Sequence, residues 1–359
     1  MLHAVIMAGG SGTRFWPQSR RELPKQFLRM TGNQTLIQQT ADRCQPAISP
    51  AHIWVVTGAA HAVETARQLT NIPANQILVE PCGRNTAPCI GLAAIELLAS
   101  DPDAIMLVTP ADHVISPNDK FQQAVTQAVS LIEAEPSTFV LFGVEPTYPS
   151  TGFGYIQRGE RLVTTSCPTY RVKSFNEKPN QLTAARFMAT SEYYWNCGIF
   201  VWRAQTILDA LKKFSPEIFE RLENIRPGIQ TGHAQVLLER EFPLMPSISI
   251  DYAVLEKAAD QVCVLEAPFE WDDVGSWQAL PRLFPTDGDG NTIDGLCCSV
   301  DSSGCIVRSD TEHLIATIGV KDLIIVHTAT ATLVADKRDE GAIKKLIAEL
   351  EKRGLTAYL

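Results

Sequence analysis

Several features that define common protein classes are missing from this chain of 359 residues. No apolar run reaches the ~20 residues of a transmembrane helix, and the N-terminus lacks the basic stretch and long apolar segment of a signal peptide. The nine cysteines are odd in number and scattered, without a Cys-x-x-Cys pair, and the seven histidines show no metal-ligand spacing. We therefore expect a cytoplasmic protein with free thiols, no structural zinc and no membrane partner.

The chain also lacks an excess of basic residues. It has 40 acidic against 31 basic side chains and a formal net charge of −9, which argues against nucleic acid as a partner. One segment is different, because between positions 14 and 29 the only acid is Glu22. Its basic residues are Arg14, Arg20, Arg21, Lys25 and Arg29. A local basic cluster in an acidic protein predicts a polyanionic ligand bound at one place.

The basic segment begins in a loop rich in glycine. An apolar run at 3–7 leads into Gly-Gly-Ser-Gly-Thr-Arg at 9–14, and Pro24-Lys25 follows. Glycines allow the backbone to approach a phosphate closely. The loop is not a P-loop, because Arg14 stands where the second glycine is needed and no Lys-Ser/Thr follows. It is not a dinucleotide fingerprint either, because Phe15 occupies the third glycine position, which disfavours a Rossmann oxidoreductase.

What remains, Gly-Gly-x-Gly-Thr-Arg followed by Pro-Lys, resembles the signature of the sugar-1-phosphate nucleotidylyltransferases. Five later segments match the same family in order; they are 80–88 (EPCGRNTAP), 110–113 (PADH), 175–179 (FNEKP), 195–200 (WNCGIF) and 271–277 (WDDVGSW). In detail they are similar to the mannose-1-phosphate guanylyltransferase branch. The resemblance implies GTP and mannose 1-phosphate as substrates, Mg²⁺ as cofactor and a homodimer. Some bacterial relatives carry an added cupin-like domain, for which we expect no counterpart in this sequence.

Apolar strand patterns alternate with helical patterns in the first half of the chain. The expected strands are 3–7, 53–57, 77–79, 105–109 and 138–144, and the expected helices lie near 35–45, 59–69, 86–99 and 120–134. This alternation predicts an α/β fold, a Rossmann-like, mostly parallel mixed sheet with helices on both faces, of the nucleotide-diphospho-sugar transferase type that the resemblance implies. The first loop, Glu80 and Asp112 would then all lie at the carboxyl ends of strands, where ligands bind.

Further along, 150–203 is strand-rich and helical patterns continue to about 282. A turn cluster at 285–291 separates a catalytic domain, 1–284, from a small domain, 285–359. Short β-like pieces recur there at roughly ten-residue spacing, which predicts a short β-helix or β-roll closed by a charged helix near 338–352.

The sequence and the resemblance together name the candidate site residues. Catalytic roles are expected for Arg14, Lys25, Asp112 and Asp273, of which Asp112 and Asp273 would bind Mg²⁺, a cation that takes carboxylates, phosphates and waters. Nucleotide binding is expected for Ala8, Gly9, Gly10, Gly12, Thr13, Glu80, Arg84 and Asn85. Sugar-phosphate binding is expected for Gly154, Glu177, Lys178 and Asn196. Glu80 is the candidate for reading guanine, because one carboxylate can accept from both N1–H and the N2 amino group.

Several alternatives stay open at this point. Asp112 could be a helix N-cap, Asp272 competes with Asp273, and Asp251 could either reach the sugar or begin a helix. Arg84 and Asn85 could contact base, ribose or phosphate, and the tryptophans are expected in the core. The activity could use another nucleotide or hexose 1-phosphate, or the chain could be an inactive regulatory subunit that binds a nucleotide sugar.

Overall fold

The computed structural model describes residues 1–10, 12–162, 167–339 and 341–359. The chain forms two compact units. The first contains residues 1–9 and 37–271, and the second contains residues 10–36 and 272–359. The second unit therefore combines the glycine-rich loop with the C-terminal strands, and it contains more than residues 285–359.

The first unit is built on a nine-stranded sheet in the order β3-β2-β1-β4-β9-β6-β10-β8-β7. The four strands at one end are parallel to one another, as predicted. They are β1 (Leu2–Ala8), β2 (Ile53–Gly58), β3 (Ile77–Glu80) and β4 (Ile105–Pro110). β1 and β4 are continuous apolar runs with almost every residue buried, because parallel sheets are covered on both faces.

The remaining strands pair mainly antiparallel. They are β6 (Phe139–Val144), β7 (Tyr155–Arg161), β8 (Thr169–Asn176), β9 (Tyr193–Arg203) and β10 (Val262–Glu266). β9 lies antiparallel between β4 and β6, and β10 runs parallel to β6 and antiparallel to β8. A further short pair joins β5 (Val114–Ser116) to β11 (Glu270–Asp272).

The prediction that helices continue to about 282 was wrong at β10 and β11. The apolar run of β10, Val262–Leu265, is fully buried between two strands. A short apolar run bounded by polar residues has no periodicity that separates a buried strand from a buried helix. The pairing partners that decide the question, β6 and β8, lie far away in the sequence.

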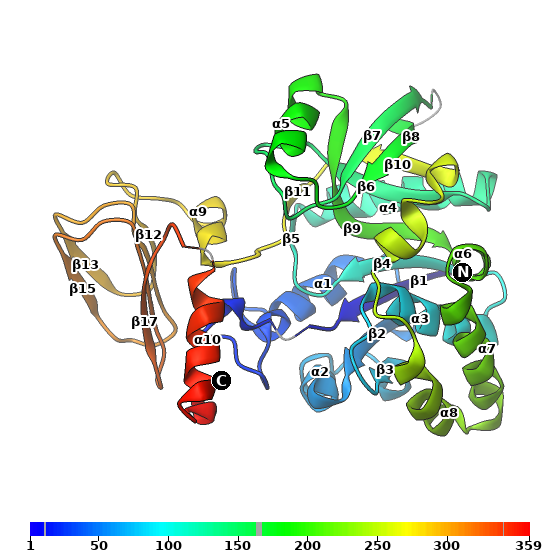
Figure 1. Ribbon diagram of the computed structural model, residues 1–359, viewed down its shortest axis with the longest axis horizontal. Coiled ribbons are helices and arrows are strands. Elements are labelled where there is room, and N and C mark those ends of the chain that lie inside the picture. Colours follow the sequence, from blue (N-terminus) through cyan, green and yellow to red (C-terminus); the bar gives the residue numbers. More distant parts are fainter. Residues whose placement is uncertain (11, 163–166, 340) are drawn as a thin grey trace. The chain divides into compact units, whose positions relative to one another are not determined.

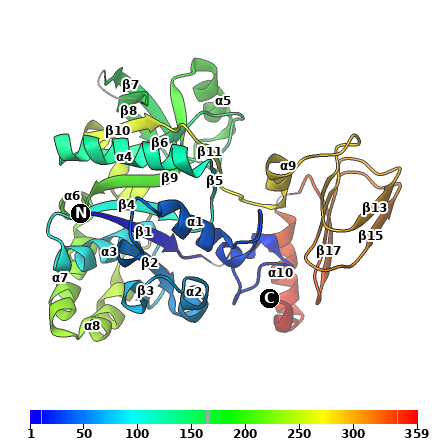
Figure 2. The ribbon, with the colours of Figure 1, turned by 180° about the vertical axis from the view of Figure 1, so that it is seen from behind.

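Helices cover both faces of this sheet (Figures 1 and 2). They are α1 (Leu36–Cys44), α2 (Ala62–Gln68), α3 (Thr86–Ser100), α4 (Asn118–Ala134), α5 (Gln181–Thr190), α6 (Ala204–Phe214), α7 (Pro216–Thr231) and α8 (Ala234–Glu241). α3, α6 and α7 share one core with Leu141 of β6. The next residue, Phe142, faces the opposite side, where its ring lies 6.0 Å from Phe269, which in turn lies 5.5 Å from Phe121 of α4.

The second unit contains the expected short β-helix. Its elements are β12 (Thr292–Asp294), β13 (Cys297–Val300), β14 (Ile306–Ser309), β15 (Ile315–Ile318), β16 (Leu323–His327), β17 (Thr332–Asp336), α9 (Leu280–Leu283) and α10 (Ala342–Lys352). β13 pairs with β15 and β14 pairs with β16, both in parallel. Paired residues such as Cys297 and Ile315 are one coil apart, and the coils enclose an apolar interior that includes Cys305 and Val307.

The glycine-rich loop packs within this second unit. Trp277 is fully buried, its ring lies 4.9 Å from Phe15 in an edge-to-face arrangement, and its Nε1 donates to the carbonyl of Trp16 at 3.1 Å. Phe15 ends the short 3₁₀ turn η1 (Thr13–Phe15), which contacts the next turn, η2 (Lys25–Phe27). The two signature turns are therefore built into the unit that carries the β-helix.

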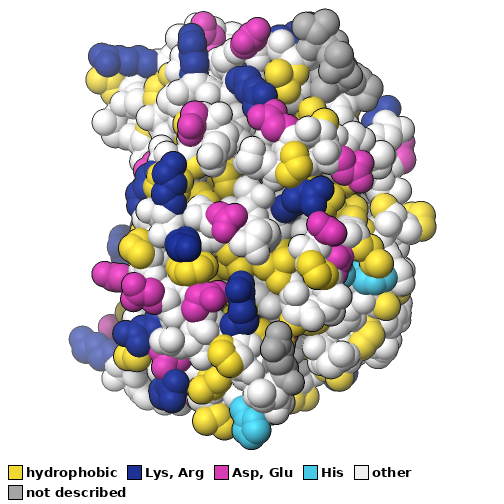
Figure 3. All heavy atoms as spheres, turned by 90° about the vertical axis from the view of Figure 1, so that its right-hand side faces the viewer, with side chains coloured by type: hydrophobic (Ala, Val, Ile, Leu, Met, Phe, Trp, Pro, Cys, Tyr) yellow, Lys and Arg dark blue, Asp and Glu magenta, His cyan; other side chains and the backbone are white. Residues whose placement is uncertain are grey.

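Figure 3 shows charged side chains of both signs on one face of the molecule. On the face in Figure 3, basic and acidic side chains are intermixed and do not form one extended patch of a single sign. Among the described helices, none has the length and hydrophobicity needed to cross a bilayer.

Candidate active site

Three predicted segments meet at the carboxyl-end edge of the parallel strands in the first unit. Ala8 ends β1 and is followed by Gly9, Glu80 ends β3, and Asp112 follows the end of β4. The register pairs Met7 with Pro110, so these strand ends are aligned along one edge. The topology confirms that Gly9, Glu80 and Asp112 lie at the carboxyl ends of parallel strands.

Asp112 lies in the tight connection between β4 and β5, where it is partly exposed. The N-cap alternative is removed, because α4 begins only at Asn118 and is preceded by Pro117. His113 accepts at Nδ1 from Trp271 Nε1 at 3.1 Å, and its Nε2 lies 3.8 Å from the Asp112 carboxylate. Nδ1 therefore carries no proton in neutral His113, so its proton is on Nε2.

The carbonyls on either side of Asp112 are held by α1. Thr40 donates its hydroxyl to Ala111 O at 3.4 Å, and Arg43 Nη2 donates to His113 O at 3.4 Å. Arg43 is buried, which lowers its pKa to about 10. These contacts orient the loop that presents the Asp112 carboxylate.

Glu80 is a buried carboxyl at the end of β3. It is 6% exposed, and its Oε1 has no hydrogen-bond partner among the described residues. Burial raises the pKa of Glu80 to about 7, although a hydrogen bond from the Cys89 thiol opposes that rise. An unsatisfied buried carboxyl oxygen at a strand end suits a ligand that brings its own donors.

Arg84 and Asn85 have roles in holding the backbone together. Asn85 has a positive φ of 67° and caps α3 by accepting from Thr86 N. Arg84 Nη2 donates to the carbonyl of Pro243. These contacts fix the turn between Glu80 and α3, and whether either side chain also meets the nucleotide stays a prediction.

The predicted sugar-phosphate residues are brought together by β7, β8 and β9. Gly154 precedes β7, and a Cβ there would lie 2.5 Å from Glu177 Oε2 and 3.3 Å from Asn196 Cβ. Gly154 O accepts from Asn196 N at 2.8 Å. Glycine at 154 therefore leaves room for the carboxylate of Glu177, which a side chain at this position would displace. Lys178 Nζ lies 2.9 Å from Glu177 Oε1.

Asp251 belongs to the same cluster, which sequence reasoning left undecided. Its Oδ1 accepts from Asn196 Nδ2 at 2.9 Å. Burial, and next the negative charge of Glu177, raise the pKa of Asp251 to about 6. Burial alone would lower the pKa of Lys178, but its hydrogen bond and ion pair with Glu177 raise it overall. The cluster thus presents two carboxyls, an amide and an ammonium, a set suited to hydroxyls and a phosphate. Only the short Asp251-Tyr252 pair in the sequence pointed to this position.

The other predicted residues lie in the second unit: Gly10, Gly12, Thr13, Arg14, Lys25 and Asp273. Gly12 has φ +52°, and a Cβ there would lie 2.4 Å from Lys25 N. Only glycine permits this approach, so the loop and η2 are packed backbone to backbone. Arg14 is exposed beside this contact, in η1.

Lys25 is a buried cation. The residue is 7% exposed, and its Nζ donates to the carbonyl of Asp273. This contact forms because the segment at 272–274 returns to η2 from far along the chain. A desolvated ammonium acts more strongly on a nearby phosphate than one in water.

Asp272 and Asp273 have distinct environments. Asp272 receives two hydrogen bonds from Arg282, at 2.5 and 3.0 Å, and one from Val274 N at 2.7 Å. Val274 is fully buried at φ +45°, a strained conformation for a β-branched residue. Next to it, a Cβ on Gly275 would lie 2.8 Å from Asp273 Oδ2. The contacts with Arg282 and Val274 commit Asp272 to structure, while the assignment of Asp273 as a carboxylate for Mg²⁺ stays a prediction.

Among the described residues, no group of three or more His, Cys, Asp or Glu side chains could hold a metal ion. Mg²⁺ does not require one, because it is usually held by one or two carboxylates together with substrate phosphates and waters. The chemistry of Asp112 and Asp273 fits that kind of site. Their role as ligands stays a prediction.

The tryptophans are mainly structural, as expected. Trp195, Trp202 and Trp277 are at most 4% exposed. Trp271 is half-buried, and its ring lies 5.2 Å from Phe153. With the bond to His113 described above, it links the Pro-Ala-Asp-His loop to the aromatic cluster beside Gly154.

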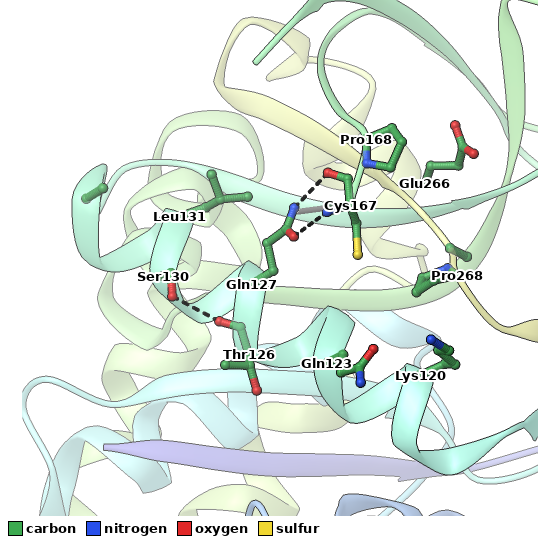
Figure 4. Close-up of a pocket in the computed structure, with 12 residues that line it drawn as sticks. Lys120, Gln123, Thr126, Gln127, Ser130, Leu131, Cys167, Pro168, Glu266 and Pro268 are labelled. Atoms are coloured by element: carbon green, nitrogen blue, oxygen red, sulfur yellow. Dashed lines mark hydrogen bonds between the residues drawn. The ribbon is translucent and has the colours of Figure 1, made fainter. Parts of the chain in front are cut away.

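A separate pocket of about 970 Å³ lies beside α4 (Figure 4). Gln127 closes one wall by accepting from Cys167 N at 2.7 Å and donating to Cys167 O at 2.9 Å. Lys120 and Glu266 place one charge of each sign on its lining. No predicted site residue lines this pocket.

Two models of known protein families match successive parts of this chain. The Nucleotidyl transferase family matches residues 3–289, and a MannoseP isomerase/GMP-like beta-helix domain matches residues 295–350. The chain belongs to the nucleotidyl transferase family.

Individual relatives narrow the branch. The chain is 40% identical to mannose-1-phosphate guanylyltransferases of Escherichia coli and Klebsiella pneumoniae, covering 100% of this chain and 76% of each relative. A solved structure from Thermus thermophilus, described as a mannose-1-phosphate geranyltransferase, is 32% identical with a TM-score of 0.85 and covers 98% of this chain and 99% of its own. The matches to the two relatives and to the solved structure extend over both the nucleotidyl transferase region and the β-helix region.

Proposed function

We propose that this protein transfers GMP from GTP to mannose 1-phosphate, giving GDP-mannose and pyrophosphate. The observation that carries the proposal is the match at 40% identity, over the whole chain, to mannose-1-phosphate guanylyltransferases. The site residues support it, because every cation and carboxylate expected for this chemistry is present in the sequence.

The reaction needs positioning and charge neutralisation more than proton transfer. A phosphate monoester has a second pKa of about 6, so the nucleophile is already ionised near neutrality. Its oxygen attacks the α-phosphorus of GTP, and the bond from that phosphorus to the bridging oxygen of pyrophosphate breaks. Arg14 and Lys25 offset the charge on the two polyanions and on the leaving pyrophosphate. The backbone of residues 9–13 provides N–H groups for the triphosphate.

Asp112 and Asp273 would hold Mg²⁺, which supplies neutralisation and alignment of the phosphate oxygens. The loop contacts from Thr40 and Arg43 orient Asp112. Gly275 leaves room for the Asp273 carboxylate. Asp272 stays with Arg282, so a single carboxylate of the pair would face the metal.

Glu80 reads the base, and the cluster at Gly154, Glu177, Lys178, Asn196 and Asp251 reads the sugar phosphate. The buried, unsatisfied Oε1 of Glu80 suits the N1–H and N2 amino donors of guanine. In the sugar cluster, carboxylates and the amide suit hydroxyls, while the ammonium of Lys178 suits the phosphate. We further expect a cytoplasmic homodimer. Light scattering of the purified protein would test the oligomeric state.

The test is a substrate panel. Pyrophosphate release is measured for GTP, ATP, UTP, dTTP and CTP, each with mannose, glucose and galactose 1-phosphates and Mg²⁺. GTP with mannose 1-phosphate is expected to give the highest kcat/KM. Another pair ten times better would replace the substrate assignment, and no release from any pair, with tight GDP-mannose binding, would indicate a regulatory subunit.

The catalytic cations have their own test. Arg14→Ala should reduce kcat by about two orders of magnitude, the scale of losing a transition-state charge contact. Because Arg14 is exposed, the unfolding temperature of the Arg14→Ala protein should stay close to that of the parent. Near-parental turnover would remove Arg14 from the catalytic group.

A further inference from the structure

Arg308 is a buried cation on the β-helix part of the second unit. It lies on β14, its side chain is 7% exposed, and Nη1 is 2.9 Å from the Asp294 carboxylate. The Asp294 side chain is 36% exposed, so it is the guanidinium that loses its solvation, a cost that a well-packed apolar side chain would not have. A guanidinium at this position therefore calls for a role beyond packing.

The guanidinium donates to the main chain that follows η2. Nη1 donates to Met30 O at 3.3 Å, and Nη2 donates to Arg29 O. A planar guanidinium can hold two neighbouring carbonyls in one fixed geometry, which an ammonium cannot do. These two carbonyls lie shortly after Lys25, and η2 and the following turn connect them to it.

The same side chain also reaches the packing around η1. Its Cζ lies 6.0 Å from the Trp277 ring. Trp277 packs edge-to-face on Phe15 of η1 and donates to Trp16 O. Arg308 therefore contacts supports of both turns that carry the predicted cations, Arg14 and Lys25.

We infer that Arg308 is a positioning residue that holds η2, and with it the Lys25 ammonium, in the geometry needed for phosphate neutralisation. The β-helix is then part of the catalytic apparatus through this side chain. This inference rests on the proposed function for its kinetic consequence, while its structural consequence, restraint of residues 24–30, is independent of the substrate.

The first experiment compares Arg308→Met with Arg338→Met in the full-length chain. Arg338 belongs to the same unit but forms an exposed ion pair with Asp336, so it controls for loss of an arginine. Arg308→Met should reduce kcat about tenfold, while the KM for mannose 1-phosphate changes less than about threefold. Arg338→Met should leave both unchanged. Parental kcat in a folded Arg308→Met protein would overturn the inference.

A double-mutant cycle separates positioning from a general structural effect. If Arg308 acts through Lys25, Arg308→Met should reduce kcat less than about twofold when Lys25→Ala is already present. The same tenfold reduction in both backgrounds would mean that Arg308 does not act through Lys25. Arg308→Lys keeps the positive charge but not the planar guanidinium, and it should recover only part of kcat. This variant provides the same test if the Arg308→Met protein does not fold.

Hydrogen exchange gives a readout that needs no substrate. Amides in peptides covering 24–30 should exchange faster in Arg308→Met than in the parent, whereas core peptides of α3 should be unchanged. Unchanged exchange at 24–30 would refute the inference even if the proposed substrates were correct. Faster exchange together with an inactive parent would refute the proposed function and leave the positioning role supported.

Discussion

At the scale of single residues, two neighbouring side chains of the same type have different surroundings. Asp272 is bound twice by Arg282, while Asp273 lies against Gly275, where a Cβ would collide with its carboxylate. The two aspartates are adjacent in the sequence, and these contacts distinguish them.

We expect Asp273→Asn to raise the Mg²⁺ concentration needed for half-maximal activity by at least about tenfold, because one anionic ligand is lost. Asp272→Asn should instead lower the unfolding temperature, because it breaks the contacts with Arg282. Magnesium titrations of both variants check this. A larger magnesium effect in Asp272→Asn would reverse the assignment.

Glu80 predicts a pH dependence of stability. Its pKa is about 7 in the folded protein, raised from 4.5 by burial. The folded state therefore favours the protonated form, so this contribution is full below pH 4.5 and is lost as pH rises through 7. Glu80→Gln should remove this loss of stability. The effect of the substitution on the free energy of unfolding should therefore be more favourable at pH 8 than at pH 4, by up to about 3 kcal/mol. Chemical unfolding at both pH values measures it, and Asp251→Asn is the comparison, since its window ends near pH 6.

The same variant tests base recognition. Gln at position 80 replaces one acceptor by a donor that faces a guanine donor, a mismatch of about 1–3 kcal/mol. ITP lacks the N2 amino group and should lose less than GTP, so the GTP/ITP ratio of kcat/KM should fall. A ratio equal to that of the parent would show that Glu80 does not contact the base edge.

At the scale of elements, the signature loop depends on one close approach. Gly12 has φ +52°, and a Cβ there would lie 2.4 Å from Lys25 N. The turn at η1 and the turn at η2 are therefore coupled through backbone contact, and a change in one must move the other.

Gly12→Ala should lower both stability and activity. We expect a loss of about 1–3 kcal/mol, from backbone strain and the collision, and a fall in kcat of at least tenfold, because Lys25 is displaced. Gly288→Ala is the control, since no atom lies within 4 Å of its added Cβ, and it should resemble the parent. Equal unfolding curves for the two variants would show that the loop tolerates a side chain.

At the scale of the whole molecule, the sequence order and the compact units do not coincide. Residues 10–36 and 272–359 form one unit. A protein cut after residue 284 would retain the signature loop but lose Arg308 and Tyr358, whose carbonyl accepts from Trp16 Nε1 at 2.7 Å. Residues after 284 therefore contribute contacts to the segment that carries the signature loop.

We expect the 1–284 fragment to have less than about 1% of parental activity and rapid amide exchange in residues 13–30, while peptides from α3 remain protected. The reason is that α3 packs in the core of the first unit, which the cut does not touch. Activity close to parental in the fragment would show that the loop holds its conformation without the β-helix.

Local sequence patterns determined much of the secondary structure and part of the candidate site. The alternation of apolar strands and helices predicted β1 to β4, and the turn-separated pieces after residue 291 predicted the β-helix. Gly154, Glu177, Lys178 and Asn196 were named from motifs and do lie together. These features are local, because strand and helix periodicity, glycine and short motifs act over a few residues.

Tertiary structure alone decided the rest. The insertion of β9 between β4 and β6, the strand β10 and the burial of Lys25 beside Asp273 O all depend on partners distant in sequence. The same holds for Asp251 on Asn196 and for Arg308 on the carbonyls after η2. Such contacts leave no periodic signal, because each is a single pairing between segments that only the folded chain brings together.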